Sequence, residues 1–512
     1  MNAFVLLALL AGLLVAPAPS PGATAREWRL RVDGEAQAIR FADLDGDLDL
    51  DACIAVVKRT GPAPERSLQL FLRSEQGYPE LPDAVIPVSD QVFWADLADL
   101  AEPAESDGSG AARLLLLDPH GLNAVDCTSG RPGLSDWADW ADRAKPVVQV
   151  ESFFRGMRSD RLLFADIARD LDLDGRLDLL LPGREGYVFY RGRPDGGFQP
   201  GQLLESAREH GIRKNQSVFF SATSRLPRPT PVDWEGDGVG DLLLAYDRKL
   251  TRIRLAAGES PGPAEELLDL ARLLDPSGAA GDGLGQTTGR ILDIDGRPGC
   301  ELLLTQRVAR PNLMAGVATR TMLYHLEDLD RSGASKPRQV IRTDGVTSPP
   351  RLFDLDLDGA LDLIVTTVRT DLMTRLRESL LSTAQVTIFV YRFERDERRF
   401  GAEPIFSESL AMPADRLLDV GAYGWVTFQA DYDGDGRPDF ASYDAEQGRL
   451  RVRRGTARSS WFRDVPIAYE DDSLFEIEVL LNGPFFGQDL DGDGRAEIIS
   501  CAGDLALIVE LP

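Results

Sequence analysis

An acidic nine-residue pattern recurs seven times along this 512-residue chain. Carboxylates stand at positions 1, 3 and 9 of every copy, and at position 5 of all copies but one. The copies read DLDGDLDLD, DLDLDGRLD, DWEGDGVGD, DIDGRPGCE, DLDLDGALD, DYDGDGRPD and DLDGDGRAE, and they begin at Asp43, Asp170, Asp233, Asp293, Asp354, Asp431 and Asp489. Such self-similarity predicts one structural unit used many times, and not several unrelated domains.

The carboxylate spacing predicts calcium binding. Alternate carboxylates of a tight, glycine-containing loop can direct oxygens at one centre, and the backbone carbonyl of position 7 can add another. A shell made only of oxygens with several negative charges suits Ca²⁺ before Mg²⁺. Six complete loops therefore predict about six structural Ca²⁺ ions, with these ligand residues: Asp43, Asp45, Asp47, Asp49, Asp51, Asp170, Asp172, Asp174, Arg176, Asp178, Asp233, Glu235, Asp237, Val239, Asp241, Asp354, Asp356, Asp358, Ala360, Asp362, Asp431, Asp433, Asp435, Arg437, Asp439, Asp489, Asp491, Asp493, Arg495 and Glu497.

An EF-hand is the obvious competitor, because its loop also begins with alternating acidic residues. An EF-hand loop closes with a carboxylate at position 12 and lies between helices. Position 12 of the six complete loops holds only Ile, Leu, Val or Ser, and β-forming runs such as LLLP, LIVTT and EIIS follow the loops. The EF-hand is therefore excluded.

The charge distribution supports metal loops over a generally acidic surface. The net charge is −27, and 27 of the 83 acidic residues occupy positions 1, 3, 5 and 9 of the seven loops. An excess of negative charge also excludes simple electrostatic binding of nucleic acid. Three histidines and four cysteines leave little material for a zinc site or for a cysteine–histidine nucleophile.

The loop that begins at Asp293 differs from the others, because Arg297 stands at its position 5. We expect the guanidinium to lie among Asp293, Asp295 and Glu301 as a built-in cation, so that this loop holds no ion. A distorted metal site is the alternative.

The spacing of the loops predicts an all-β propeller. Loop starts lie about 60 to 77 residues apart, except for a first gap of 127 that leaves room for one degenerate unit, in which Asp96, Asp99 and Asp107 are only loosely placed. Each unit reads as four short strands, which is typical of propeller blades. We predict eight blades, at about 37–91, 92–157, 158–226, 227–287, 288–348, 349–422, 423–481 and 482–512 plus 27–32, with seven blades as the alternative. The orphan strand Glu27–Val32 is expected to complete the last blade and close the ring.

Segments outside the repeat predict three further features. Residues 1–25 combine an apolar run with a small-residue cleavage site, which predicts a signal peptide followed by a single propeller domain over 26–512. An uncleaved anchor is the alternative for the first segment. No later segment has eighteen consecutive apolar residues, so no membrane span is expected in the mature chain, which would be extracellular or periplasmic. Leucines at helical spacing predict helices over Thr370–Ala384 and Ala264–Asp275.

The loop sequences resemble the FG-GAP, or VCBS, repeat family, whose calcium-loop propeller is also seen in the integrin alpha head. DYDGDGRPD and DLDGDGRAE are close to the pattern of that family, and the resemblance covers nearly all of 26–512. It implies a blade with calcium between its first two strands, and adhesion or scaffold roles outside the cell. The degenerate unit and Arg297 depart from the pattern.

Three functions remain open on the sequence. The first is a secreted, non-enzymatic, calcium-binding propeller that binds an unknown protein or glycan. The second is a polysaccharide-lyase-type enzyme that acts on acidic glycans, and the third is a tethered component of a surface or secretion assembly. Four cysteines allow three pairings, and Cys53 with Cys501 is the pair expected to meet across the closure of the ring, with buried free thiols as the alternative.

Overall fold

A computed structural model of the chain describes most of residues 25–511. The internal residues outside the description are 62, 101–110, 128–143, 156, 206–208, 215–219, 226–227, 247–248, 257, 270–272, 274–286, 310–316, 330–335, 370–382, 414–421, 445–446, 460–463, 480 and 482. The predicted signal peptide falls almost wholly outside the described residues, as does Asp107.

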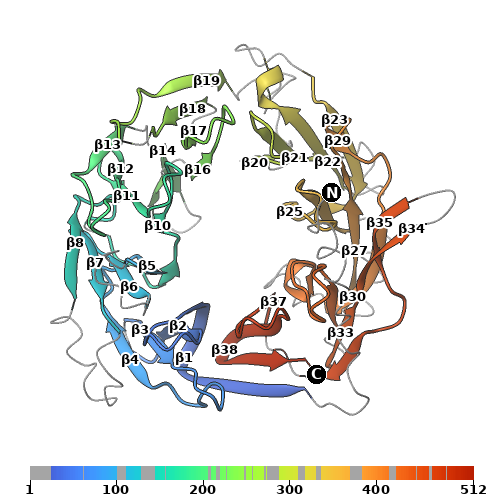
Figure 1. The fold of residues 1–512 in the computed structure, drawn as a ribbon, viewed down its shortest axis with the longest axis horizontal. Helices are drawn as coiled ribbons and strands as arrows, with labels where there is room; N and C mark the ends of the chain where they lie inside the picture. Colours follow the sequence, from blue (N-terminus) through green and yellow to red (C-terminus); the bar gives the residue numbers. More distant parts are fainter. Residues whose placement is uncertain are drawn as a thin grey trace, which may run out of the picture.

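In the described part of the chain, seven sheets of four to six strands stand in a ring around a central opening (Figure 1). The fold is thus the all-β propeller that the repeat predicts. Three further pairs of strands lie outside these sheets: β14 (Glu209–Lys214) with β15 (Phe220–Arg225), β28 (Phe393–Glu394) with β29 (Arg399–Phe400), and β34 (Gly455–Ser459) with β35 (Asp464–Tyr469).

Five of the seven sheets contain four consecutive or nearly consecutive strands. The first comprises β10 (Ala168–Arg169), β11 (Asp178–Gly183), β12 (Gly186–Tyr190) and β13 (Gln202–Glu205), and the second comprises β16 (Arg228–Val232), β17 (Asp241–Tyr246), β18 (Lys249–Arg254) and β19 (Glu265–Asp269). The third comprises β20 (Thr287–Leu292), β21 (Glu301–Ala309), β22 (Val317–His325) and β23 (Gln339–Asp344), and the fourth comprises β25 (Arg351–Phe353), β26 (Asp362–Val368), β27 (Thr383–Tyr391) and β30 (Phe406–Pro413), with β24 (Val346–Thr347) also on β26. The fifth comprises β31 (Val426–Thr427), β32 (Phe440–Asp444), β33 (Arg449–Arg453) and β36 (Phe475–Glu478). Two short 3₁₀ helices are described, η3 (Leu326–Asp328) and η4 (Ala422–Trp425).

The degenerate unit forms a sheet of its own, and residues 101–110, between its first two strands, lie outside the described residues. Its strands are β5 (Trp94–Ala98), β6 (Arg113–Leu117), β7 (Gly121–Val125) and β8 (Lys145–Gln149), and β9 (Leu163–Phe164) adds parallel to β5. Asp96 is buried in this sheet and accepts hydrogen bonds from the backbone N–H groups of Ile167 and Ala168 at 2.6 and 3.2 Å. This aspartate therefore stabilises the adjoining backbone.

The expected eight blades are wrong, and the seven-bladed alternative is right. The last unit does not form a sheet of its own, because β37 (Phe485–Gln488) and β38 (Glu497–Glu510) join β2 (Asp51–Lys58), β3 (Glu65–Phe71) and β4 (Ala84–Val88) in one six-stranded sheet. The 17-residue strand β1 (Arg26–Ala42) connects the two halves. Its start pairs with β38 and its end pairs with β2.

The predicted closure by the N-terminal strand is confirmed. Residues Arg26–Arg31 pair antiparallel with Leu505–Glu510. Trp28, Leu30 and Val32 alternate inward and are buried, and they pack in one cluster with Ile54 and Ile508. One strand therefore joins the two ends of the chain by hydrogen bonds and by apolar contact.

The core lies in layers between neighbouring sheets. Strand β2 has one face in such a layer, where Cys53 and Ala55 pack toward the β5–β8 sheet. On its other face, Ile54 and Val56 pack against β38, which belongs to the same six-stranded sheet. Both faces of such a strand are buried, which explains the uninterrupted apolar runs after the loops. Cys53 shares its layer with Cys127, whereas Cys501 packs against the opposite layer, so the expected Cys53–Cys501 pair does not meet and all four thiols are free.

The helix expected over Ala264–Asp275 is wrong for its described start. Residues Glu265–Asp269 form β19, the outer strand of its sheet, and Leu268 is buried against Leu250. The outer edge of a blade needs a strand there, and this pairing overrides the helical spacing of the leucines. Residues 370–382 of the other expected helix lie outside the described residues, and β27 begins at Thr383.

The strand that closes the ring should be essential for folding. We expect a chain that begins at Gly34 to accumulate in insoluble form, because β38 loses the partner that connects it to β2. A chain that begins at Arg26 keeps this strand and is the matched control. Equal solubility and equal melting temperatures for the two chains would show that the ring closes without β1.

Candidate metal centres in the acidic loops

Each acidic loop joins the first two strands of its unit, as the sequence predicts. The seven loops follow β1, β10, β16, β20, β25, β31 and β37 and lead into β2, β11, β17, β21, β26, β32 and β38. In Figure 1, β10, β16, β20, β25 and β37 stand nearest the central opening, whereas β4, β8, β13, β19 and β23 lie at the outer rim. The loops are thus repeated at equivalent places around the ring.

The aspartate at position 1 holds the turn of its own loop. In the first loop, Asp43 accepts hydrogen bonds from the backbone N–H groups of Gly46 at 2.7 Å and Leu48 at 3.0 Å. In the six complete loops the backbone at positions 4 and 6 adopts positive φ, which glycine tolerates best. Leu48, Leu173 and Leu357 nevertheless hold φ values of 74°, 62° and 61° in an exposed setting. Leucine in this region is strained, so the loop shape is imposed against local preference.

The carboxylate at position 9 fastens the loop to the sheet. Asp362 accepts hydrogen bonds from the backbone N–H groups of Leu355, at position 2, and Phe393, just after the third strand, at 3.0 and 2.8 Å. Asp439 does the same with Tyr432 and Gly455 at 2.9 and 2.7 Å. All seven position-9 carboxylates are buried: Asp51, Asp178, Asp241, Glu301, Asp362, Asp439 and Glu497.

Burial also changes the protonation of position 9. Loss of water raises the pKa of Asp51, Asp362 and Asp439 to about 7, against the opposing effect of the backbone N–H groups. The pKa of Glu497 rises to about 7 and that of Asp178 to about 6 for the same reason. Carboxylates at the other positions add to the rise by repulsion.

In three of the loops, the aspartate at position 3 leaves one oxygen without a partner. Asp45 Oδ1, Asp172 Oδ1 and Asp356 Oδ1 are all buried and accept no hydrogen bond. Their side chains lie with positions 1 and 9 of the same loop, with ligand oxygens within 4.8 Å of one another, as in Asp170, Asp172 and Asp178. A buried carboxylate oxygen without a donor is costly. A hard cation bound by these oxygens would satisfy it, so the donor set fits Ca²⁺.

An arginine satisfies the second oxygen of position 3 in several loops. Arg191 Nε lies 2.6 Å from Asp172 Oδ2, and Arg392 Nε lies 2.5 Å from Asp356 Oδ2. Arg454 contacts Asp433 in the same way. These three arginines each follow the third strand of the blade directly, and sequence reasoning missed them. The signal was present as an arginine directly after each of these strand sequences, GYVFY, TIFVY and RLRVR.

The Asp293 loop has an arginine among its carboxylates, but it is not Arg297. Arg398, between β28 and β29, places Nε 2.8 Å from Asp295 Oδ2 and Nη2 3.2 Å from Glu301 Oε1. Arg297 stays about half exposed with Nε 4.0 Å from Asp295 Oδ2. The expected residue was therefore wrong, because a cation 97 residues beyond Glu301 cannot be identified from the loop sequence.

Neighbouring loops are joined by backbone hydrogen bonds. The N–H of Leu361 donates to the carbonyl of Ile294 at 2.8 Å, and the N–H of Ala496 donates to the carbonyl of Asp431 at 2.7 Å. The backbone N–H of Gly299 donates to the carbonyl of Trp234, and the backbone N–H of Gly240 donates to the carbonyl of Asp172, so these neighbouring loops are joined in the same way. The apolar residue at position 2, such as Leu171 or Leu355, is buried between its own sheet and the next. A loop that changes shape would therefore disturb the next blade.

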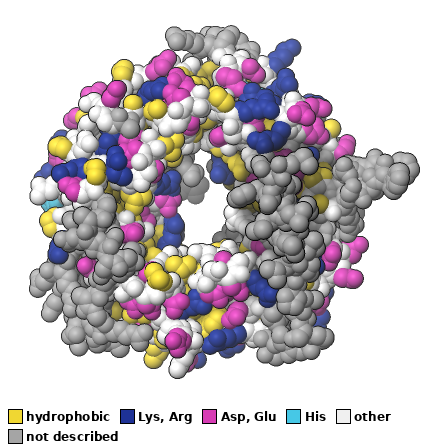
Figure 2. All heavy atoms as spheres, viewed as in Figure 1, with side chains coloured by type: hydrophobic (Ala, Val, Ile, Leu, Met, Phe, Trp, Pro, Cys, Tyr) yellow, Lys and Arg dark blue, Asp and Glu magenta, His cyan; other side chains and the backbone are white. Residues whose placement is uncertain are grey.

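A cavity of about 440 Å³ lies among first strands near the central opening. Arg290, Arg351, Phe353 and Phe486 line it, together with Gln429 and other residues of β25, β31 and β37. Its described lining includes two arginines and no carboxylate, in a chain of net charge −27. Figure 2 shows the opening through the molecule, with acidic and basic side chains interspersed around it.

Comparisons with known proteins identify no family for the chain. No family model matches the chain, and no curated protein matches it. Solved structures that resemble it include the Dos1 propeller, with 9% identity, a TM-score of 0.42 and 95% coverage of both chains. A WD40 domain of coronin from Toxoplasma gondii has 8% identity and a TM-score of 0.34, covering 95% of this chain and 87% of its own. An Agrocybe aegerita lectin that recognises non-reducing terminal N-acetylglucosamine has 15% identity and a TM-score of 0.33, covering 76% of this chain and 94% of its own. Similarities this low say nothing of what this chain binds.

Among the described residues, no helix is long and apolar enough to cross a membrane.

The raised pKa values predict how stability depends on pH. In the calcium-free protein these carboxylates bind protons more tightly when folded than when unfolded, so their contribution to stability is present at low pH and lost as the pH rises from about 4 toward 7. We expect the melting temperature of the calcium-free protein to fall between pH 5 and pH 8. Excess calcium should raise the melting temperature more at pH 8 than at pH 5, because a metal binds the deprotonated carboxylates. A calcium-free melting temperature that rises over this range would contradict the assignment.

Proposed function

We propose that the chain is an exported, non-enzymatic propeller of the FG-GAP or VCBS type, stabilised by about six Ca²⁺ ions, that binds a protein or glycan. The observation that supports the metal is the buried, unpartnered oxygen at position 3 of three loops. The same aspartates already use their other oxygen for an arginine in two of those loops. One further positive partner is therefore needed at the same place in these three loops.

The residues at positions 1, 3 and 5 of the six complete loops, together with the carbonyl at position 7, would hold the ions. Position 9 would close the site from the buried side. Bound calcium would neutralise repulsion among these carboxylates and hold positions 4 and 6 in their strained shape. Because the loops are repeated and contact one another around the ring, this arrangement supports a structural role rather than one active site.

Two matched substitutions test the metal assignment. Asp356→Asn should remove one bound calcium, because Asp356 Oδ1 has no other partner. Asp295→Asn changes the same position of the Asp293 loop, in which Arg398 forms an ion pair with Asp295. This substitution should leave the number of bound calcium ions unchanged. Elemental analysis after dialysis gives the count. At calcium concentrations about 100 times the Kd, Asp356→Asn should also lose roughly 2.7 kcal/mol of calcium-dependent stability. An unchanged count in Asp356→Asn, or a loss in Asp295→Asn, would refute the assignment.

The cavity at Arg290 and Arg351 is the proposed ligand site. Guanidinium groups bind carboxylates with planar, two-pronged geometry, and the rings of Phe353 and Phe486 offer apolar faces for a sugar or aromatic ring. These side chains favour a ligand that carries a carboxylate next to a ring, such as an acidic glycan. The described lining contains no His, Lys, Tyr, Asp or Glu that could act as a base, which supports binding rather than cleavage.

A glycan array tests this ligand class. We expect the protein to retain uronate- or sialate-containing glycans over neutral ones, and Arg351→Gln to weaken this binding at least tenfold. Arg342→Gln, at an exposed position of β23 outside the cavity, is the matched control. Binding that survives Arg351→Gln would place the ligand elsewhere. The release of unsaturated, ultraviolet-absorbing products from uronate polymers would instead establish a lyase.

A further inference from the structure

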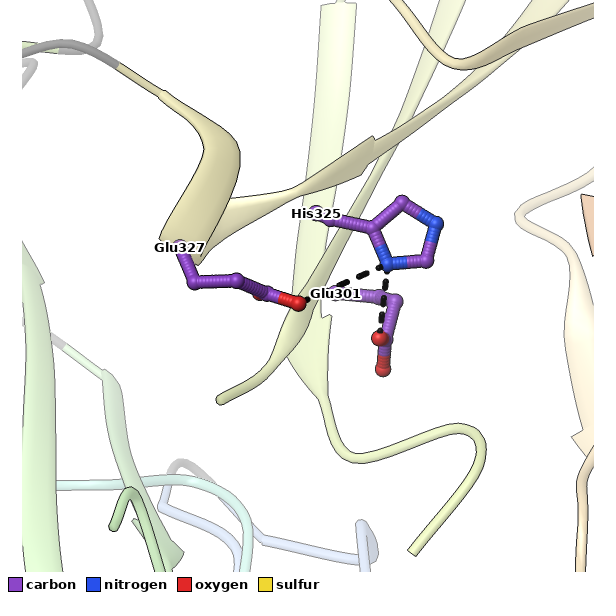
Figure 3. A group of neighbouring side chains, drawn as sticks. All are labelled: Glu301, His325 and Glu327. Carbon is purple, nitrogen blue, oxygen red and sulfur yellow. Dashed lines mark ion pairs between the residues drawn. The ribbon is translucent and has the colours of Figure 1, made fainter. Parts of the chain in front are cut away.

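A histidine and two glutamates converge beside the Asp293 loop. Glu301 begins β21 and pairs across the sheet with His325, the last residue of β22, and Glu327 follows in η3. Figure 3 shows the two carboxylates directed at the same edge of the imidazole ring. The His325 side chain is only 2% exposed and that of Glu301 only 1%, whereas Glu327 is about one-third exposed. His325 follows the sequence ATRTMLY at the end of the third strand of its unit. Other units have an arginine at the corresponding position.

The hydrogen bond on the far side of the ring fixes which nitrogen faces the carboxylates. His325 Nε2 lies 2.8 Å from the backbone carbonyl oxygen of Arg398. A carbonyl oxygen can only accept, so Nε2 carries a proton. Nδ1 is buried and has no hydrogen-bond partner, yet it lies 3.2 Å from Glu301 Oε1 and 3.9 Å from Glu327 Oε1. In the neutral ring, the lone pair of Nδ1 therefore faces two carboxylate oxygens, an arrangement that calls for a positive partner between them.

The separations fit a small metal ion. Ligands that lie 2.0–2.1 Å from a tetrahedral Zn²⁺ stand about 3.3 Å apart, which matches the 3.2 Å between Nδ1 and Glu301 Oε1. The 3.9 Å to Glu327 Oε1 is longer, and the partly exposed Glu327 side chain would have to move toward the ion. A metal-bound histidine commonly donates its other N–H to a backbone carbonyl, as Nε2 does here. We propose that Glu301, His325 and Glu327 bind one Zn²⁺ ion, or another divalent transition metal that accepts mixed nitrogen and oxygen ligands.

Arg398 is compatible with this metal site. Its guanidinium contacts Asp295, Glu301 and Glu327, so one positive charge serves three carboxylates. Each glutamate oxygen has more than one lone-pair direction, so it can bind a metal and still accept from the guanidinium. Carboxylates that bind metals are themselves usually hydrogen-bonded. Arg398 would then orient Glu301 and Glu327 while the metal completes the charge balance.

This site differs in chemistry from the six complete loops. Those loops offer only oxygen atoms, which suit Ca²⁺, whereas an imidazole nitrogen selects a borderline metal such as Zn²⁺. Glu301 can belong both to the Asp293 loop and to the proposed zinc site, because it uses a different oxygen for each. Its Oε2 accepts a hydrogen bond from the backbone N–H of Ile294 in the loop at 2.8 Å, whereas Oε1 faces His325. The proposal does not depend on calcium binding elsewhere.

The test is a zinc titration of the full chain in excess calcium, so that the acidic loops are occupied by the ion they prefer. Calorimetry and competition with a coloured chelator should give one Zn²⁺ per chain. His325→Ala should lower the zinc affinity by roughly 100-fold or more. His120→Ala is the matched control, because His120 lies at an exposed turn, and it should bind zinc as the wild type does. Co²⁺ in place of zinc should give a visible absorption band that His325→Ala abolishes.

Two results for the wild type and His325→Ala would overturn the proposal. One is the absence of zinc uptake by the wild type in excess calcium, which would leave His325 as a protonated partner of Glu301. The other is equal zinc uptake by wild type and His325→Ala, which would place the zinc in the acidic loops. Glu327→Gln provides a second variant if His325→Ala does not fold, because the Glu327 side chain is partly exposed. It should also weaken zinc binding, and unchanged affinity in Glu327→Gln would count equally against the site.

Discussion

The structure depends on a buried carboxylate at position 9 of each acidic loop. In four loops it accepts hydrogen bonds from the backbone N–H groups of position 2 and of the second residue after the third strand. One side chain thereby connects the first, second and third strands of a blade. Because the carboxylate is shielded from water, it holds this role only while donors or cations surround it. The acidic residue at position 9 therefore has a structural role, which is to hold three strands of a blade together.

The same loops also connect one blade to the next. Their apolar position 2 packs into the layer between sheets, and backbone hydrogen bonds pass from one loop to the following one. A ring assembled this way transmits stability from neighbour to neighbour, and β1 supplies the last contact. Where the loop carboxylates lack enough donors, arginines from the ends of third strands supply positive charge, and Arg398 does so for the Asp293 loop.

The sequence predicted what is local and periodic. The unit length, the loop between the first two strands and the closure by Glu27–Val32 all follow from patterns that repeat along the chain. The number of blades could not be derived, because it depends on whether β1 joins the last unit to the first in one sheet. Arg398 and the cavity at Arg290 and Arg351 were also missed, since their residues meet only through the curvature of the ring. The strand β19 was misread because its leucines fit a helix equally well.

The central claim is that six loops of this propeller are built around a hard cation and that the Asp293 loop is not. The most direct measurement is an anomalous difference map from crystals grown in calcium chloride. The account predicts one strong peak among positions 1, 3 and 5 of each complete loop, and none between Asp293 and Asp295. Maps that show only water in the six loops, with the oxygens of Asp172 and Asp356 still unpartnered, would contradict it.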